Sequence, residues 1–239
     1  MENIGKIHQG CLPYYMEEVE QSSGYILYEC QIPNFTKSDE CEQSIYSKPL
    51  KLINCSDRAI VFMDGLKIGT YEKGIDSEAV FEQATCKTGA KIQVLVENLG
   101  RINYGHDLYV YKGIEEIRYG IITFYGYKTV SLPMNNLEKL NYNKLENGGE
   151  SPAFYKGKFY VDKVCDTFVK PSGFTKGFIV VNGVNLGRFY NTAGPQKTLY
   201  LPAPYLRKGE NEIIIFESDK VNELKVEFVD APIVEKEQE

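Results

Sequence analysis

The stretch RAIVFMDGLKIGTYEKG, residues 58–74, has a counterpart further along the chain in KGFIVVNGVNLGRFY, residues 176–190. Their Asp-Gly and Asn-Gly pairs, at 64–65 and 182–183, align at an offset of 118 residues. An Asx-Gly pair between two β-prone runs predicts a two-residue hairpin, because both turn positions need positive φ. Each copy is therefore predicted to be a strand, a tight turn and a returning strand.

The similarity between the copies continues past the hairpin. Gly69 and Gly187 keep the same offset, and a second pair of segments follows, KTGAKIQVLVENLG at 87–100 and RKGENEIIIFESD at 207–219. Each of these reads as a polar turn that leads into a buried strand. A duplicated β-unit indicates two similar domains, and 239 residues suit two domains of about 90–110 residues each.

The pattern predicts an all-β fold with two tandem jelly-roll-like β-sandwiches. Short strands recur with turn signals between them, and no strands alternate with helices. We expect a linker or arm over 1–23, a first sandwich over 24–133, a linker over 134–149, a second sandwich over 150–234 and a tail over 235–239.

The composition excludes several classes of protein. The net charge of −6 and pI of about 5.2 argue against a nucleic-acid partner, which would need clustered Lys and Arg. No apolar run is long enough to span a membrane, so no membrane partner is expected, and residues 1–23 lack a signal-peptide pattern. We therefore expect a cytoplasmic protein. Six cysteines without metal-ligand spacing are expected to be free thiols, and neither a metal nor another cofactor is predicted.

Catalytic constellations are poor. Neither His8 nor His106 lies near a recognisable nucleophile motif. The adjacent acids Glu17-Glu18 and Glu115-Glu116 would point to opposite faces of a strand, so they could not flank one glycosidic bond. No catalytic residue is predicted.

Two segments carry more polar and aromatic groups than a generic sandwich needs. Residues 97–105 place an Arg, an Asn and a Tyr in a loop after a strand, where sandwich proteins often hold recognition groups. Residues 181–190 surround similar residues with glycines, although these glycines could equally be hairpin and bulge positions, with Asn185 and Arg188 satisfying backbone groups. The candidate site residues are Arg101, Asn103, Tyr104, Asn185, Arg188 and Tyr190.

The second copy and its flanks carry a family resemblance. The run KGFIVVNGVNLGRFYNTAGPQKTLYLPAPYLRKGENEIIIFE, residues 176–217, resembles the C-terminal signature of glycoside hydrolase family 35, the β-galactosidases. Its pattern there is roughly K-G-x-V-W-V-N-G-x-N-L-G-R-Y-W, then G-P-Q-x-T-L-Y-V-P, then K-x-G-x-N-E-I. The similarity covers about 24–233 and includes Gly24–Tyr28, Glu97–Gly105, Pro152–Tyr155, Asp166–Phe168 and Phe228–Ile233.

The resemblance implies a supporting role. In that family two such β-domains follow a (β/α)₈ barrel that carries both catalytic glutamates and most galactose contacts. This chain cannot contain such a barrel, which needs about 250 residues of alternating strands and helices. The implied partner is a catalytic barrel, in cis or on a separate chain.

For the candidate residues, the resemblance implies substrate-entrance or sugar-binding roles. The family tyrosine matched by Tyr104 lines the entrance of the barrel site, and the second domain has the galactose-binding-like sandwich fold. Two tryptophans expected near Val180 and Tyr190 are missing, which leaves Tyr190 as a smaller aromatic face for galactosides.

Three hypotheses result. The first is a non-catalytic β-domain pair that supports a catalytic barrel and shapes its galactoside entrance. The alternative is a stand-alone carbohydrate-binding module. The third, a hydrolase in its own right, has no predicted catalytic residue.

Overall fold

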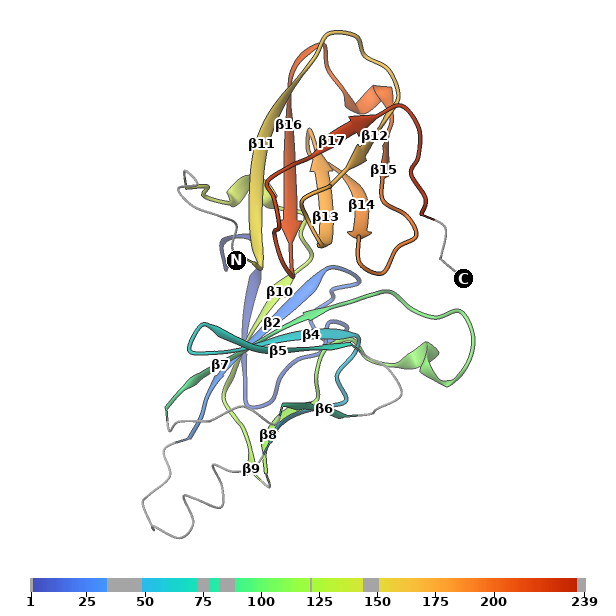
Figure 1. Cartoon of the computed structure of the whole chain (residues 1–239). Helices are drawn as coiled ribbons and strands as arrows, with labels where there is room; N and C mark the ends of the chain where they lie inside the picture. Colours follow the sequence, from blue (N-terminus) through green and yellow to red (C-terminus); the bar gives the residue numbers. More distant parts are fainter. Residues whose placement is uncertain are drawn as a thin grey trace. The chain divides into compact units, whose positions relative to one another are not determined.

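The structure is a computed structural model that describes residues 2–33, 49–72, 78–81, 89–120, 122–143 and 151–235. The all-β prediction is confirmed: the described elements are strands and short 3₁₀ turns (Figure 1). The chain forms two compact units, 1–140 and 141–239. Their boundary falls inside the segment that the sequence predicts as a linker, 134–149.

The first unit contains two antiparallel sheets. Its strands are β1 (Lys6–Gly10), β2 (Tyr25–Gln31), β3 (Leu50–Ile53), β4 (Arg58–Met63), β5 (Leu66–Glu72), β6 (Glu78–Phe81), β7 (Lys91–Glu97), β8 (Glu116–Tyr119), β9 (Ile122–Thr123) and β10 (Tyr127–Leu132). One sheet has the order β1-β10-β2-β7-β4-β5 and the other the order β6-β3-β8-β9. The 3₁₀ turns are η1 (Glu2–Ile4), η2 (His106–Tyr109) and η3 (Leu137–Lys139).

The second unit repeats the central part of this arrangement. Its elements are β11 (Ala153–Val161), β12 (Thr167–Lys170), β13 (Lys176–Val181), β14 (Val184–Tyr190), β15 (Leu199–Leu201), η4 (Ala203–Tyr205), β16 (Gly209–Glu217) and β17 (Glu227–Val229). The order β11-β16-β13-β14 matches β2-β7-β4-β5, and β15-β12-β17 matches β6-β3-β8. The sequence repeat is therefore a repeat of topology, and β1, β9 and β10 are additions to the first unit.

The two predicted hairpins are confirmed by their turns. Asp64 and Gly65 have φ of 48° and 80°, and Asn182 and Gly183 have φ of 50° and 84°. Each Asx side chain also binds the third strand: Asp64 Oδ1 accepts from the Lys91 N–H at 2.8 Å, and Asn182 Oδ1 accepts from the Glu212 N–H at 3.0 Å. The Asx residue therefore makes the turn and ties it to the adjacent strand.

A β-bulge recurs at the same place in both hairpins. The register shifts after Val61 in the first copy and after Ile179 in the second, 118 residues later. The glycines of the repeat lie beside it, as the structural reading of these glycines predicts. Gly187 has φ of 117°, whereas a Cβ on Gly69 would lie 2.6 Å from the Phe81 ring. The two copies therefore need glycine beside the bulge for different reasons, a positive φ at Gly187 and the close approach of Phe81 at Gly69.

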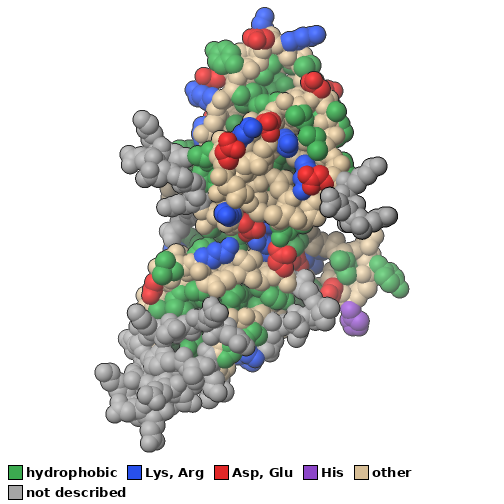
Figure 2. Space-filling model, in the orientation of Figure 1, with side chains coloured by type: hydrophobic (Ala, Val, Ile, Leu, Met, Phe, Trp, Pro, Cys, Tyr) green, Lys and Arg blue, Asp and Glu red, His purple; other side chains and the backbone are tan. Residues whose placement is uncertain are grey.

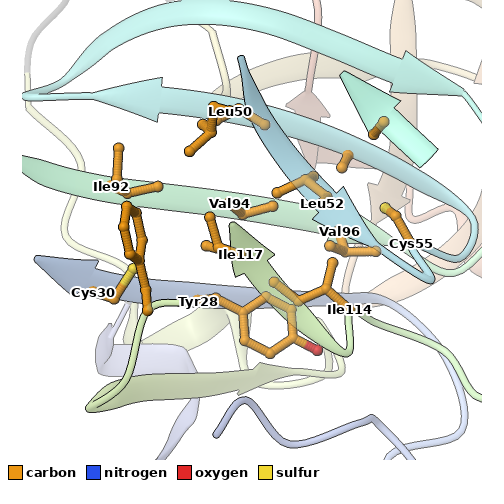
Figure 3. Packing of buried hydrophobic residues seen from close by; sticks show 14 of the residues in the cluster. Tyr28, Cys30, Leu50, Leu52, Cys55, Ile92, Val94, Val96, Ile114 and Ile117 are labelled. Atoms are coloured by element: carbon orange, nitrogen blue, oxygen red, sulfur yellow. The ribbon is translucent and has the colours of Figure 1, made fainter. Parts of the chain in front are cut away.

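Each unit has its core between its two sheets. In the first unit, β2, β3, β7 and β8 turn alternate side chains toward one another, and Figure 3 shows Tyr28, Leu52, Val94 and Ile117 meeting there. The second core is built from β12–β16. Its fully or nearly fully buried members include Val169, Ile179, Val181, Leu201 and Ile215. Members of each core alternate along their strands, as a pleated strand requires, although β4 and β13 are buried at consecutive residues.

The segment expected to be a linker or arm, 1–23, is integrated into the first unit. Residues 6–10 form β1, which pairs with β10 from Lys6↔Ser131 to Gly10↔Tyr127. Met16 is fully buried in the core, and the Gln21 side-chain oxygen accepts from the Leu132 N–H at 3.1 Å. A polar edge strand with one neighbour carries no hydrophobic alternation, so the sequence pattern does not reveal it.

The other expected connecting segments are described only in part. Leu137, in the predicted linker, is buried in the first unit. Glu235, the first residue of the predicted tail, donates its N–H to the Pro195 carbonyl at 2.9 Å. Residues 144–150 and 236–239 lie outside the described part of the chain.

Candidate recognition loops

Three candidate residues lie in the connection that leaves β7, residues 98–112. From here on we call this connection the arm; it is not the N-terminal segment 1–23. The arm contains η2 and is drawn in Figure 1 as the green loop with a short helical turn. Gly100 and Gly105 turn the chain with φ of 104° and 101°, values that favour glycine. Arg101, Asn103 and Tyr104 all lie between or beside these two glycines.

A buried ion pair closes the base of the arm. Lys112 Nζ lies 2.6 Å and 2.7 Å from the two carboxylate oxygens of Asp57, and both side chains are largely buried. Asp57 Oδ2 also accepts from the Leu99 N–H at 2.7 Å. One carboxylate thus ties both ends of the arm to the start of β4. Removing either charge would leave its partner buried and uncompensated.

Arg101 bridges the middle of the arm. Its Nη1 donates to the Val110 carbonyl at 2.8 Å and to the Leu108 carbonyl at 3.3 Å, and its Nη2 forms an ion pair with Glu17. The Glu17 carboxylate also accepts from the Lys112 N–H, at 2.9 Å to Oε2. These contacts hold the chain to itself. A contact of Arg101 with substrate stays a prediction.

The tip of the arm carries exposed aromatic and aliphatic side chains beside polar ones. Tyr104 is 89% exposed and Tyr109 is 82% exposed, with Ile102 and Asn103 also exposed between the two glycines. Tyr111 stacks on Tyr15, with ring centroids 5.2 Å apart. In the same orientation as Figure 1, Figure 2 shows hydrophobic side chains at the surface of this region. Clustered exposed apolar groups commonly mark interaction surfaces.

The three candidates of the second segment lie along one face of β14. Asn185, Arg188 and Tyr190 stand opposite alternate residues of β13, namely Val180, Phe178 and Lys176. On a regular strand, residues three apart, such as Asn185 and Arg188, would point to opposite faces. The bulge adds one residue between them and so brings all three side chains to the same face.

Two of these residues also have local structural contacts. Asn185 Oδ1 accepts from the Gly187 N–H at 2.8 Å, which supports the bulge. Tyr190 presents its ring to Lys176, whose Nζ lies 4.7 Å from the ring centroid. Arg188 is exposed. The alternative reading, that this polar group satisfies the hairpin itself, holds for Asn185. Sugar binding by this face stays a prediction.

Sequence reasoning missed the polar groups that hold these segments in place. Asp57, Lys112 and Glu17 support the arm. In the second unit the buried Glu217 accepts backbone N–H bonds from Thr175 at 2.7 Å, Asp219 at 2.7 Å, Lys220 at 3.1 Å and Lys176 at 3.1 Å. Burial raises the pKa of the Glu217 carboxyl, and these N–H groups counteract the shift. No local motif identifies such residues, because each of them has partners that are distant in sequence, such as Thr175 and Lys176 for Glu217.

The described residues offer little for a metal site, a disulfide or a membrane span. They contain no group of three or more His, Cys, Asp or Glu side chains placed to hold a metal ion. Cys11, Cys30, Cys55 and Cys165 form no disulfide bond, and Cys41 and Cys86 lie outside the described part. Among the described helices, none has the length and apolar character of a membrane span.

Comparison with known proteins gives consistent matches over both units. Residues 13–133 match the family model "Beta-galactosidase, first all-beta domain", and residues 152–211 match "Beta-galactosidase, galactose-binding domain". Beta-galactosidase 17 of Arabidopsis thaliana is 32% identical over 91% of this chain and 34% of its own length. Beta-galactosidase of Mus musculus is 32% identical over 93% of this chain and 38% of its own length.

This chain therefore spans about a third of the length of these curated relatives. Among solved structures, a β-glucuronidase of Bacteroides uniformis aligns over 90% of this chain and 22% of that chain, with a TM-score of 0.30 and 16% identity. That likeness is too weak to carry an argument.

Proposed function

Because this chain belongs to the β-galactosidase family of glycoside hydrolases and matches two of its β-domains, we propose that it acts as a non-catalytic β-domain pair. In this proposal the pair supports a catalytic (β/α)₈ barrel, either in cis or on a separate chain. The observation that carries the proposal is coverage: the alignments with these relatives include more than nine tenths of this chain but only about a third of the relatives' own length.

The arm supports the finer part of the proposal, that the pair shapes the galactoside entrance. Its tip holds Tyr104 and Tyr109 in solvent, while its base is tied down by Asp57 and Lys112. An aromatic ring offers a flat face to the C–H groups of a pyranose and a hydroxyl to its oxygens. Under this proposal Tyr104 contributes such a face at the mouth of the barrel.

The experiment is reconstitution. The chain is produced together with the barrel-coding sequence that adjoins or accompanies its gene, and hydrolysis of an aryl β-galactoside is followed with and without the chain. We expect a stable assembly that is active, and no turnover by the chain alone. Turnover by the isolated chain, or a fully active barrel that ignores the chain, would overturn the proposal.

A matched pair of variants tests the entrance role. Tyr104→Ala should raise KM several-fold with little change in kcat, because a contact made equally in ground and transition states is lost. Tyr160→Ala is the control, since Tyr160 is 77% exposed on β11 in the second unit. Equal effects of the two variants would remove the entrance role while leaving the supporting role intact.

The alternative is a stand-alone galactoside-binding module, which the alignment of Asn185, Arg188 and Tyr190 on one face of β14 supports. Titration of the isolated chain with galactose and lactose distinguishes it. Saturable binding that Arg188→Ala weakens would favour this alternative, and absence of heat and of any melting shift would exclude it.

A further inference from the structure

We propose that Glu17 and Arg101 are positioning residues that fix the pose of the arm before it meets the catalytic domain. The proposal rests on the proposed function and deepens it. It assigns Arg101 to the support of Tyr104 rather than to direct contact with the substrate.

The first step is the geometry of the arm, which is fastened at two levels. The lower level is the Asp57–Lys112 pair, which joins the two ends. It leaves residues 100–111 free to adopt many conformations, because closing a loop at its ends orders little of its interior. The upper level, Arg101, reaches across to the carbonyls of Leu108 and Val110. Arg101 therefore links the two sides of the arm above its base and restricts the residues between 101 and 110.

The second step is the chemistry of the crossing group. A guanidinium offers five donors in a planar fork, so it can serve two carbonyls and a carboxylate at once. Arg101 does this with Leu108, Val110 and Glu17. A lysine ammonium in its place has three donors around a single point and could not span these acceptors.

The third step is the link from the arm to the body of the unit. Glu17 receives Arg101 and also the Lys112 N–H, and its neighbour Met16 donates its N–H to the Lys112 carbonyl at 2.8 Å. Met16 itself is anchored in the core with no exposed surface. The turn at residues 15–20 is thus anchored in the core, and the arm is bound to this turn through Arg101 and Lys112.

The consequence is preorganisation of the tip. A loop that is already ordered loses less conformational entropy on association, so its contacts contribute more fully to affinity. Arg101 would therefore influence substrate entrance only through the position of Tyr104 and its neighbours.

The test uses the full chain assembled with its catalytic domain. Arg101→Met should raise KM several-fold, by no more than Tyr104→Ala does, with kcat nearly unchanged. Arg101→Lys should recover only part of the loss. Arg118→Met is the matched control, because Arg118 has a similar exposure (45% against 42%) and also pairs with a less exposed glutamate, Glu116 on β8.

Two further measurements separate positioning from general support. In a Tyr104→Ala background, Arg101→Met should add little to KM, because the two residues act in series. Hydrogen exchange of the free chain should accelerate in residues 99–111 for Arg101→Met and not for Arg118→Met.

The outcomes are distinguishable. Full additivity of the Arg101 and Tyr104 changes, or an Arg101→Met assembly with wild-type KM, would overturn the positioning role while the supporting role stands. A chain that never joins a catalytic domain would overturn the proposed function, and unchanged exchange in Arg101→Met would then overturn the positioning role independently.

Discussion

The two copies differ most in the connection that follows their third strand. Between β7 and β8 the chain runs through residues 98–115, whereas the equivalent connection between β16 and β17 is half as long, residues 218–226. The strands on either side keep the same order and pairing. The extra length in the first unit is the arm with its exposed tyrosines. The duplication thus shows a scaffold held constant while one loop was elaborated, the usual way in which recognition is added to a sandwich.

The bases of the two connections use equivalent positions with different chemistry. In the first unit Asp57 accepts from the Leu99 N–H. In the second, Thr175, 118 residues later, donates its hydroxyl to the Lys220 carbonyl at 2.7 Å. The short connection is held there by this neutral hydrogen bond and by the Glu217 carboxylate, which accepts from the Asp219 and Lys220 N–H groups. The long connection is held by the Asp57–Lys112 ion pair.

The largest expected effect concerns a buried residue that the copies do not share. Ala59 and Gly177 are equivalent residues of the two copies. Val96 lies opposite Ala59 and Glu217 lies opposite Gly177, so Val96 and Glu217 are equivalent as well. Glu217→Val would give the second unit the first unit's residue and leave four backbone N–H groups without their acceptor. We expect a loss of about 3–5 kcal/mol in the free energy of unfolding, measured by urea denaturation.

Glu217→Gln sharpens this comparison, because it keeps the shape and one acceptor oxygen. Its loss should be about half as large. A Glu217→Val protein as stable as wild type would mean that the four N–H groups find other partners.

The next effect concerns the base of the arm. Lys112→Met should cost about 3 kcal/mol, because the Asp57 carboxylate stays buried without its counter-ion. Asp57→Asn in the same chain should restore part of the stability, since it removes the uncompensated charge. A double variant that is less stable than Lys112→Met alone would contradict this account of the ion pair. Denaturation midpoints of the three variants give the comparison.

The third prediction separates two reasons for the same glycine. Gly187→Ala should lower the free energy of unfolding by about 1–2 kcal/mol through the positive φ alone. The new methyl group would make only an ordinary van der Waals contact, 3.9 Å from Leu199. Gly69→Ala should destabilise by collision with the Phe81 ring. Phe81→Leu should therefore lessen the effect of Gly69→Ala. If it does not, the bulge backbone rather than the ring sets the requirement in both copies. Melting temperatures of the single and double variants measure this.

These comparisons also indicate what the sequence could predict. The hairpins were predictable because an Asx-Gly pair dictates its own turn locally, whatever surrounds it. The supports of the arm were not, since Asp57 and Lys112 are 55 residues apart and Glu17 and Arg101 are 84 apart. Arg101 was identified as unusual from its loop, but its partner could be known only once the fold brought the turn 15–20 against the arm.

The edge strand β1 shows the same limit for secondary structure. KIHQG has no alternation that would separate it from a linker, and its place in the sheet is decided by β10, more than 110 residues later. Non-local pairing of this kind overrides weak local preference.

The smallest expected effect concerns the cross-strand pair at the end of each hairpin. Arg58 and Lys176 are equivalent and both are 3% exposed, yet Arg58 binds Glu72 at 2.7 Å while Lys176 faces the ring of Tyr190. Tyr190→Phe should cost less stability than Tyr190→Leu, because the ring and its cation–π contact remain. Tyr190→Leu should cost about 1 kcal/mol. Tyr190→Glu would copy the pair of the first unit and should lie between these two, as an ion pair replaces the ring at the expense of its packing. A Tyr190→Phe variant as damaged as Tyr190→Leu would show that the hydroxyl, not the ring, contributes the stability of this pair in the second copy.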